Sequence, residues 1–135
     1  MKISKNFRLE ELTKSNAAES LKIDNTPKVE HIVNLCALVH YVLQPLRDST
    51  GLAVRINSGY RSPATNKAIG GVANSQHMRG QAADIVVAGM TPRYVADYIA
   101  HRFPFDQLIV YPTFVHVSYN IEGNRGQRLT KRGHQ

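Results

Sequence analysis

Two histidines and one aspartate have the types and spacing of a metal site. His77 lies in a polar loop, and Asp84 follows seven residues later within the apolar run Ala82–Val87. His116 lies within the second strand-like run, Phe114–Ser118. A carboxylate in an apolar strand is costly to bury unless something positive pairs with it. Two imidazoles and a carboxylate suit catalytic zinc, with water as the fourth ligand. The residues alone leave two alternatives open, a buried Asp–His pair without metal and a hydrogen-bonded polar patch.

Hydrophobic spacing and turn signals predict the elements that position these residues. Apolar residues recur at three- and four-residue spacing from Thr26-Pro27 to Leu46, which predicts a long helix that Pro45 should kink or end. A helical turn is predicted at Ala64–Ile69 and a second helix from Thr91-Pro92 to about Arg102. The predicted strands are Val54–Asn57, Ala82–Val87, Gln107–Tyr111 and Phe114–Tyr119, the last two joined through Pro112-Thr113. This order predicts an α+β fold, with a small, mostly antiparallel sheet and flanking helices.

Length and charge describe a basic single domain. The chain has 135 residues and a net charge of +7, and no linker or repeat divides it. The charge favours anionic partners, and no motif for specific nucleic-acid binding accompanies it. The longest apolar stretches are too short to span a membrane, and the charged N-terminus does not resemble a signal peptide. The basic tail from about residue 122 is predicted to be a mobile terminus.

Four motifs in order resemble the zinc D-alanyl-D-alanine carboxypeptidase family. Residues 75–84, SQHMRGQAAD, resemble its S-x-H-x-x-G-x-A-x-D signature. Residues 56–63, INSGYRSP, are similar to its S-G-Y-R-S motif, and residues 114–118, FVHVS, to its closing W-V-H-V-S strand. Residues 7–13 together with 24–27 resemble the N-terminal region of small phage- and prophage-type members. The family also contains phage endolysins and vancomycin-resistance dipeptidases, and it shares its fold with the hedgehog signalling domain.

The resemblance implies roles for particular residues. It implies one Zn²⁺ bound by His77, Asp84 and His116, and it makes Arg61 the arginine that faces the substrate carbonyl or carboxylate. A guanidinium there would stabilise the developing oxyanion. Gly80 permits a close turn between the first two ligands. The motif residues expected at the substrate are Ser58, Tyr60, Ser75 and Gln76. Ser75 and Gln76 could also orient His77.

One position departs from the family pattern. Many members carry Glu or Asp three residues before the last histidine ligand, where it acts as general base, and this chain has Thr113 there. Threonine is too weak a base for this task at neutral pH. Three explanations follow: a carboxylate such as Asp106 or Glu122 replaces it, zinc-bound hydroxide acts with only Thr113 and water to position it, or catalysis is lost. Asp106 also has a simpler interpretation, as a turn residue that hydrogen-bonds backbone.

The expected function is therefore a zinc peptidase that cleaves D-Ala-containing peptides of bacterial peptidoglycan. The expected partners are those peptides and the anionic cell wall. A protein without a signal peptide would be made in the cytoplasm and reach the wall after release, as phage and prophage products do. The alternative is a non-catalytic zinc- or peptidoglycan-binding domain.

Overall fold

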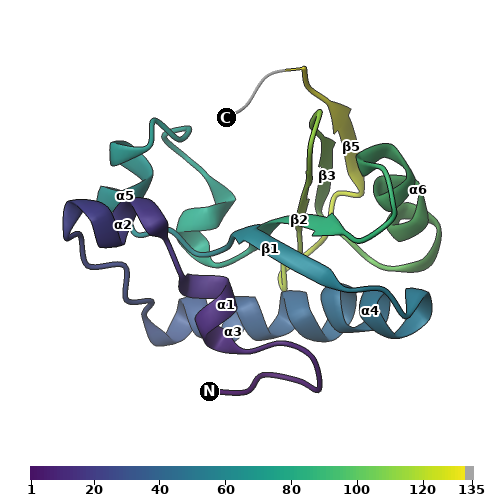
Figure 1. Ribbon diagram of the computed structural model, residues 1–135, viewed down its shortest axis with the longest axis horizontal. Coiled ribbons are helices and arrows are strands. Elements are labelled where there is room, and N and C mark those ends of the chain that lie inside the picture. Colours follow the sequence, from purple (N-terminus) through teal and green to yellow (C-terminus); the bar gives the residue numbers. More distant parts are fainter. Residues whose placement is uncertain (133–135) are drawn as a thin grey trace.

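The computed structural model describes residues 1–132 (Figure 1). Its helices are α1 (Leu9–Thr13), α2 (Asn16–Leu21), α3 (Val29–Leu38), α4 (Gln44–Thr50), α5 (Pro63–Ala68) and α6 (Pro92–Arg102). A π-helical segment, η1 (Val39–Leu43), joins α3 to α4, and a 3₁₀ turn, η2 (Gln76–Arg79), precedes the second strand. The strands are β1 (Val54–Ser58), β2 (Ala82–Val87), β3 (Gln107–Val110), β4 (Val115–Ser118) and β5 (Gln127–Thr130).

The five strands form one mixed sheet in the order β1-β2-β4-β3-β5. Every neighbouring pair is antiparallel except β3 and β5, which are parallel. The predicted α+β class and mostly antiparallel sheet are therefore confirmed. The register places Asp84 on β2 opposite His116 on β4, and it places Ile109 on β3 opposite His116. Side chains alternate between faces of a strand, so these three residues share one face of the sheet.

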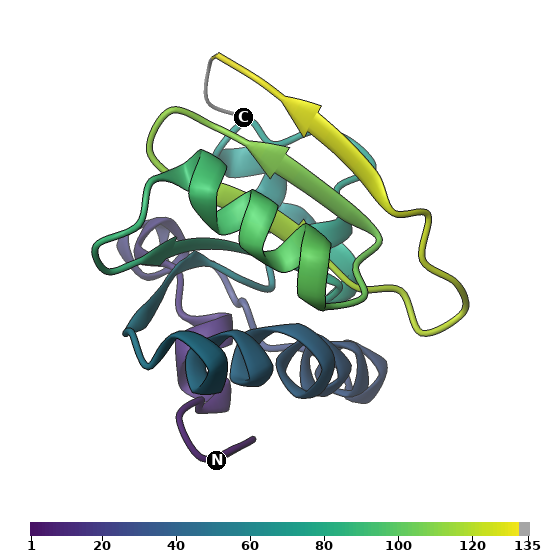
Figure 2. The same cartoon turned by 90° about the vertical axis from the view of Figure 1, so that its right-hand side faces the viewer.

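The opposite face of the sheet carries the hydrophobic core. Ile85, Val115 and Val117 point to that face and are fully buried. The long helical segment and α6 cover them, and α6 lies across the sheet in Figure 2. The helices contribute Leu35, Leu38, Val39, Val42, Leu43, Leu46, Val95, Ala96 and Ile99 to the same core. Among the described residues, no helix is both long and apolar enough to cross a bilayer.

The long helix begins later than predicted, and Pro45 does not end it. It begins at Val29 rather than at Thr26-Pro27, because the backbone N–H of Lys28 donates to Nδ1 of His31 at 3.1 Å and so caps the helix there. It continues past Pro45 to Thr50. Proline cannot donate the helical hydrogen bond, and its ring presses on the preceding turn. The wider π-helical turn at Val39–Leu43 lies just before the proline and accommodates it without ending the helix.

The two ends of the chain contain elements that the spacing did not predict. The short helices α1 and α2 precede the long helix, and Leu12 of α1 is fully buried. The tail was predicted to be a mobile terminus from about residue 122, but Gln127–Thr130 instead pairs with β3 as β5. All four β5 residues are exposed, and their pairing comes from the backbone, which explains why no apolar pattern marks the strand.

Gly80 ends η2 with a φ of +73°, and a Cβ added there would lie 2.5 Å from the carbonyl oxygen of His31. Gly51 ends α4 with a φ of +67° and has open space around it. We expect Gly51→Ala to lower the free energy of unfolding by about 1 kcal/mol, the cost of the left-handed backbone. Gly80→Ala should cost clearly more, because its methyl group also meets α3. Urea unfolding of both variants measures the difference, and equal losses would show that the close approach is unimportant.

Candidate metal centre

Three buried side chains converge on the site face of the sheet. His77 comes from η2, Asp84 from β2 and His116 from β4. One ligand atom from each lies within 4.8 Å of the other two, and none of the three side chains is more than one-tenth exposed. The structure thus brings together the three residues that the sequence predicted as ligands. Their spacing in the fold comes from the β2–β4 register and from the turn that ends at Gly80.

The ring of His77 is held by a backbone carbonyl. Its Nδ1 lies 2.7 Å from the carbonyl oxygen of Gly59, which can only accept, so Nδ1 carries the proton. Nε2 faces Asp84 Oδ1 at 3.2 Å, and in the neutral ring it presents a lone pair there. Gly59 itself packs against α1, where an added Cβ would lie 2.2 Å from the Leu12 carbonyl oxygen. Ser75 caps η2 by accepting from the backbone N–H of His77 at 3.2 Å, so its contact is with the backbone and not with the ring.

The ring of His116 is held by Gln76. His116 Nε2 lies 3.0 Å from Gln76 Oε1, and Nδ1 lies 3.2 Å from Asp84 Oδ1. The amide nitrogen of Gln76 donates to Asp106 Oδ2 at 2.8 Å. Gln76 therefore orients His116, whereas the sequence motif predicted that it orients His77. The difference arises because the 3₁₀ turn directs successive side chains to different sides.

The arrangement suits a cation. With protons on His77 Nδ1 and His116 Nε2, two imidazole lone pairs point at the same oxygen of Asp84. A metal ion between them would satisfy all three atoms, and two imidazoles with one carboxylate leave an open position for water or substrate. The site residues therefore fit Zn²⁺, with His77 bound through Nε2 and His116 through Nδ1.

The pKa values of Asp84 and His116 are both shifted in the absence of a metal ion. Burial alone would raise the pKa of Asp84, but His77 and His116 outweigh burial through charge and hydrogen bonds, and the pKa lies well below its usual value. Burial lowers the pKa of His116 against the opposing effect of Asp84. An ionised carboxylate and a neutral imidazole are the forms that bind a metal.

Arg61 adds a buried positive charge close to the cluster. Its side chain is only slightly exposed, and its backbone N–H donates to the carbonyl oxygen of His77 at 3.0 Å. Burial lowers the pKa of its guanidinium, and the nearby Asp84 and Tyr111 oppose this effect. A guanidinium in proteins stays protonated. Arg61 thus lies where it can act on a negative charge that develops beside Asp84.

A cleft of about 480 Å³ opens beside the cluster. It is lined by Val72, Asn74, Ser75, Gln76, Gln107, Ile109, Tyr111, His116 and Lys131. The predicted residues Ser75 and Gln76 are among them. Tyr111 and Lys131 were not predicted, and Lys131 reaches the cleft only because β5 extends the sheet beyond β3. Its ammonium group is suited to a carboxylate on a bound peptide.

Two residues expected at the substrate lie elsewhere. Tyr60 is 3% exposed and stacks on His31, with ring centroids 4.8 Å apart, so it packs into the core rather than the cleft. Burial raises the pKa of its phenol. Ser58 pairs with Asp84 next to a register shift in β1, and it does not belong to the described lining of the cleft. Both residues flank Gly59, whose carbonyl oxygen contacts His77.

The candidate general bases are not among the residues that line the cleft. Thr113 is exposed in the β3–β4 turn. Glu122 is exposed in the loop after β4. Asp106 is buried, and its two carboxylate oxygens accept from Arg125 and Gln76, which lower its pKa. Within the described part of the chain, the lining of the cleft includes no Asp or Glu.

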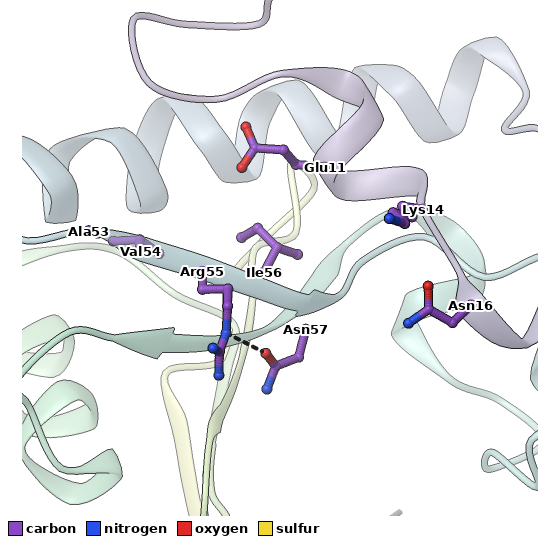
Figure 3. Close-up of a pocket in the computed structure, with 8 residues that line it drawn as sticks. All are labelled: Glu11, Lys14, Asn16, Ala53, Val54, Arg55, Ile56 and Asn57. Atoms are coloured by element: carbon purple, nitrogen blue, oxygen red, sulfur yellow. Dashed lines mark hydrogen bonds between the residues drawn. The ribbon is translucent and has the colours of Figure 1, made fainter.

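A second hollow lies apart from this site. It has a volume of about 460 Å³ and is lined by Glu11, Lys14, Asn16, Ala53, Val54, Arg55, Ile56 and Asn57. Figure 3 shows Arg55 and Asn57 on the same side of β1, joined by a hydrogen bond of 3.3 Å. None of its residues belongs to the His77–Asp84–His116 cluster, so the hollow has no part in the metal centre.

An α+β fold with a buried His–Asp–His cluster beside a cleft is consistent with a metal-dependent hydrolase. A sequence model of the Peptidase M15 family matches residues 5–118. The chain belongs to the Peptidase M15 family, and this membership implies zinc peptidase activity on peptidoglycan peptides. The match covers all three cluster residues and Arg61 and ends before β5. A search of curated proteins finds no match to this chain.

Removing any ligand should abolish stoichiometric zinc. We expect His77→Ala, Asp84→Ala and His116→Ala each to bind much less than one zinc per chain after dialysis, because two remaining ligands hold the ion too weakly. His101→Ala is the matched control, since His101 is an exposed histidine on α6. Elemental analysis of the dialysed proteins measures the ratio. Full zinc occupancy in any ligand variant would rule out this site.

Proposed function

We propose that the protein is a zinc peptidase that cleaves D-Ala-containing stem or cross-bridge peptides of peptidoglycan. The observation that carries this proposal is the buried His77–Asp84–His116 cluster beside the cleft, in a chain of the Peptidase M15 family. Lys131 on the cleft wall supports a substrate with a free carboxylate. The positive charge of +7 favours the anionic wall. The resemblance to small phage- and prophage-type members supports action on the wall after release from the cell.

The side chains divide the work of peptide hydrolysis. When bound, Zn²⁺ would polarise the scissile carbonyl and lower the pKa of its water toward ~7. Arg61 stabilises the negative charge that develops on the carbonyl oxygen, and its burial strengthens this interaction because little water screens it. Ser75 and Gln76 line the cleft and hold the two histidines in place.

Proton removal from the attacking water does not depend on a carboxylate of the cleft. Thr113 lies in an exposed turn, and the two oxygens of Asp106 are occupied by other partners. A metal-bound water with a pKa near ~7 requires less help from a base than free water does. We therefore propose that the chain works without the usual Glu or Asp three residues before His116.

The same observation supports a second candidate function. A domain that retains the metal and the cleft but lacks a carboxylate base could bind peptidoglycan peptides without cutting them. Binding to wall fragments would then survive in the absence of any hydrolysis. The two functions differ in whether new amino groups appear.

Zinc-loaded protein should release new amino groups from purified peptidoglycan, and Arg61→Lys should reduce the rate. Lysine keeps the charge but cannot reproduce the planar guanidinium, and loss of one oxyanion donor costs about 10²–10³ in kcat. Amino-group labelling measures the rate, and thermal unfolding checks that the variant is folded. If wild-type protein with full zinc binds wall fragments but releases no amino groups from several peptidoglycan types, the binding-domain function is correct.

Thr113→Ala and Glu122→Gln should each retain activity within about threefold of the wild type. Both side chains are exposed, so neither substitution should disturb folding. The same amino-group assay measures the effect. A loss of about 10² or more in either variant, the size expected for a general base, would contradict the proposal that no such carboxylate or hydroxyl is required.

A further inference from the structure

A chain of hydrogen bonds connects the C-terminal segment to the metal cluster. Arg125 donates to Asp106 from its backbone N–H at 2.8 Å, from Nε at 3.1 Å and from Nη2 at 2.8 Å. Asp106 Oδ2 accepts from Gln76 Nε2 at 2.8 Å. Gln76 Oε1 lies 3.0 Å from His116 Nε2, and His116 Nδ1 lies 3.2 Å from Asp84. Arg125 lies beyond the residues that the family model matches.

The chemistry of the four side chains fixes which group donates and which accepts in each of these hydrogen bonds. Arg125 can only donate, so both oxygens of Asp106 act as acceptors. Gln76 must then turn its NH₂ group toward Asp106 and its carbonyl oxygen toward His116. A carbonyl oxygen accepts, so the proton of His116 is held on Nε2. The remaining nitrogen, Nδ1, keeps its lone pair and faces Asp84.

We propose that Arg125, Asp106 and Gln76 are positioning residues that hold the proton of His116 on Nε2 and leave Nδ1 free for the metal. We call these three residues the positioning chain. The inference rests on the metal site of the proposed function. It assigns to the tail a role that neither its charge nor its family membership provides.

A second ion pair, between Arg128 and Asp97, also anchors the tail but does not reach the metal cluster. Arg128 of β5 donates to Asp97 of α6 and also holds the tail against the body of the protein. This pair is partly exposed on both sides and has no contact with the cluster. The Asp106 side chain, by contrast, is 2% exposed and contacts Gln76 directly. The two pairs therefore separate anchoring of the tail from orientation of His116.

Asp106→Asn should reverse the donor and acceptor roles along these hydrogen bonds, because asparagine has nearly the same shape as aspartate but carries an NH₂ group. We expect the amide introduced by this substitution to keep its oxygen at Oδ1, where it accepts from the backbone N–H and Nε of Arg125. Its NH₂ group then replaces Oδ2, and the hydrogen bond from Arg125 Nη2 is lost. Two NH₂ groups cannot pair, so the Gln76 amide turns and presents its own NH₂ to His116 Nε2. The proton of His116 then moves to Nδ1, the atom that should bind the metal. The double variant Gln76→Glu with Asp106→Asn restores an acceptor for Nε2–H at the same total charge.

The test measures zinc dissociation constants by competition with a chelator. We expect Asp106→Asn and Arg125→Ala to weaken zinc binding by about 10–100-fold, the usual cost of losing a group that orients a ligand. The matched controls, Asp97→Asn and Arg128→Ala, should bind zinc within about threefold of the wild type. The Gln76→Glu/Asp106→Asn double variant should recover most of the affinity.

Long-range ¹H–¹⁵N spectra of the histidine rings show which nitrogen of His116 carries the proton. This position would not change if the three residues only stabilised the fold. In the wild type, His116 should carry its proton on Nε2, and in Asp106→Asn it should carry the proton on Nδ1. Thermal unfolding of every variant checks that the fold is intact.

The outcomes distinguish failure of the positioning chain from failure of the site. If the wild type binds no zinc, the proposed metal site is wrong, and the proposed role of the positioning chain is wrong as well. If the wild type binds zinc and Asp106→Asn behaves like Asp97→Asn, the metal site stands and the positioning chain is wrong. An unchanged His116 proton in Asp106→Asn, or no recovery in the double variant, would also overturn it.

Discussion

The structure depends on one crowded contact, in which two imidazole nitrogens meet a single carboxylate oxygen of Asp84 at 3.2 Å each. Both imidazoles have their other nitrogen committed to an acceptor, Gly59 O for His77 and Gln76 Oε1 for His116. When both imidazoles are neutral, their lone pairs and the carboxylate oxygen face one another in a buried place, and a bound cation would relieve this repulsion. Much of the surrounding architecture maintains this contact: the β2–β4 register, the close turn at Gly80 and the approach of Gly59 to α1.

The two faces of the sheet have different roles, since one forms the hydrophobic core and the other carries the candidate metal centre. One face packs against the long helix and α6 and supplies the core, whereas the other face carries the cluster and the cleft. The rigid face gives the ligands fixed positions, and the open face admits a peptide. Family membership implies a zinc peptidase, and this chain has Thr113 three residues before His116, where the resembled pattern has Glu or Asp.

The three residues of the His77–Asp84–His116 cluster could be predicted from the sequence because their types are unusual for their surroundings and their motifs occur in order. The α+β class followed from the spacing of apolar residues. Partners across long sequence distances could not be predicted: Gln76 reaches His116 rather than His77, and Tyr60 stacks on His31. β5 escaped prediction because its side chains are exposed, so its backbone pairing with β3 leaves no apolar pattern.

A crystal structure of the zinc-loaded protein, with the ion located by anomalous scattering at the zinc edge, would show which atoms of the cluster bind the metal. We predict one ion bound by His77 Nε2, a carboxylate oxygen of Asp84 and His116 Nδ1 at about 2.0–2.2 Å, with its fourth position open to the cleft. An ion elsewhere, or coordination through His77 Nδ1 or His116 Nε2, would show that the proposed metal site is wrong.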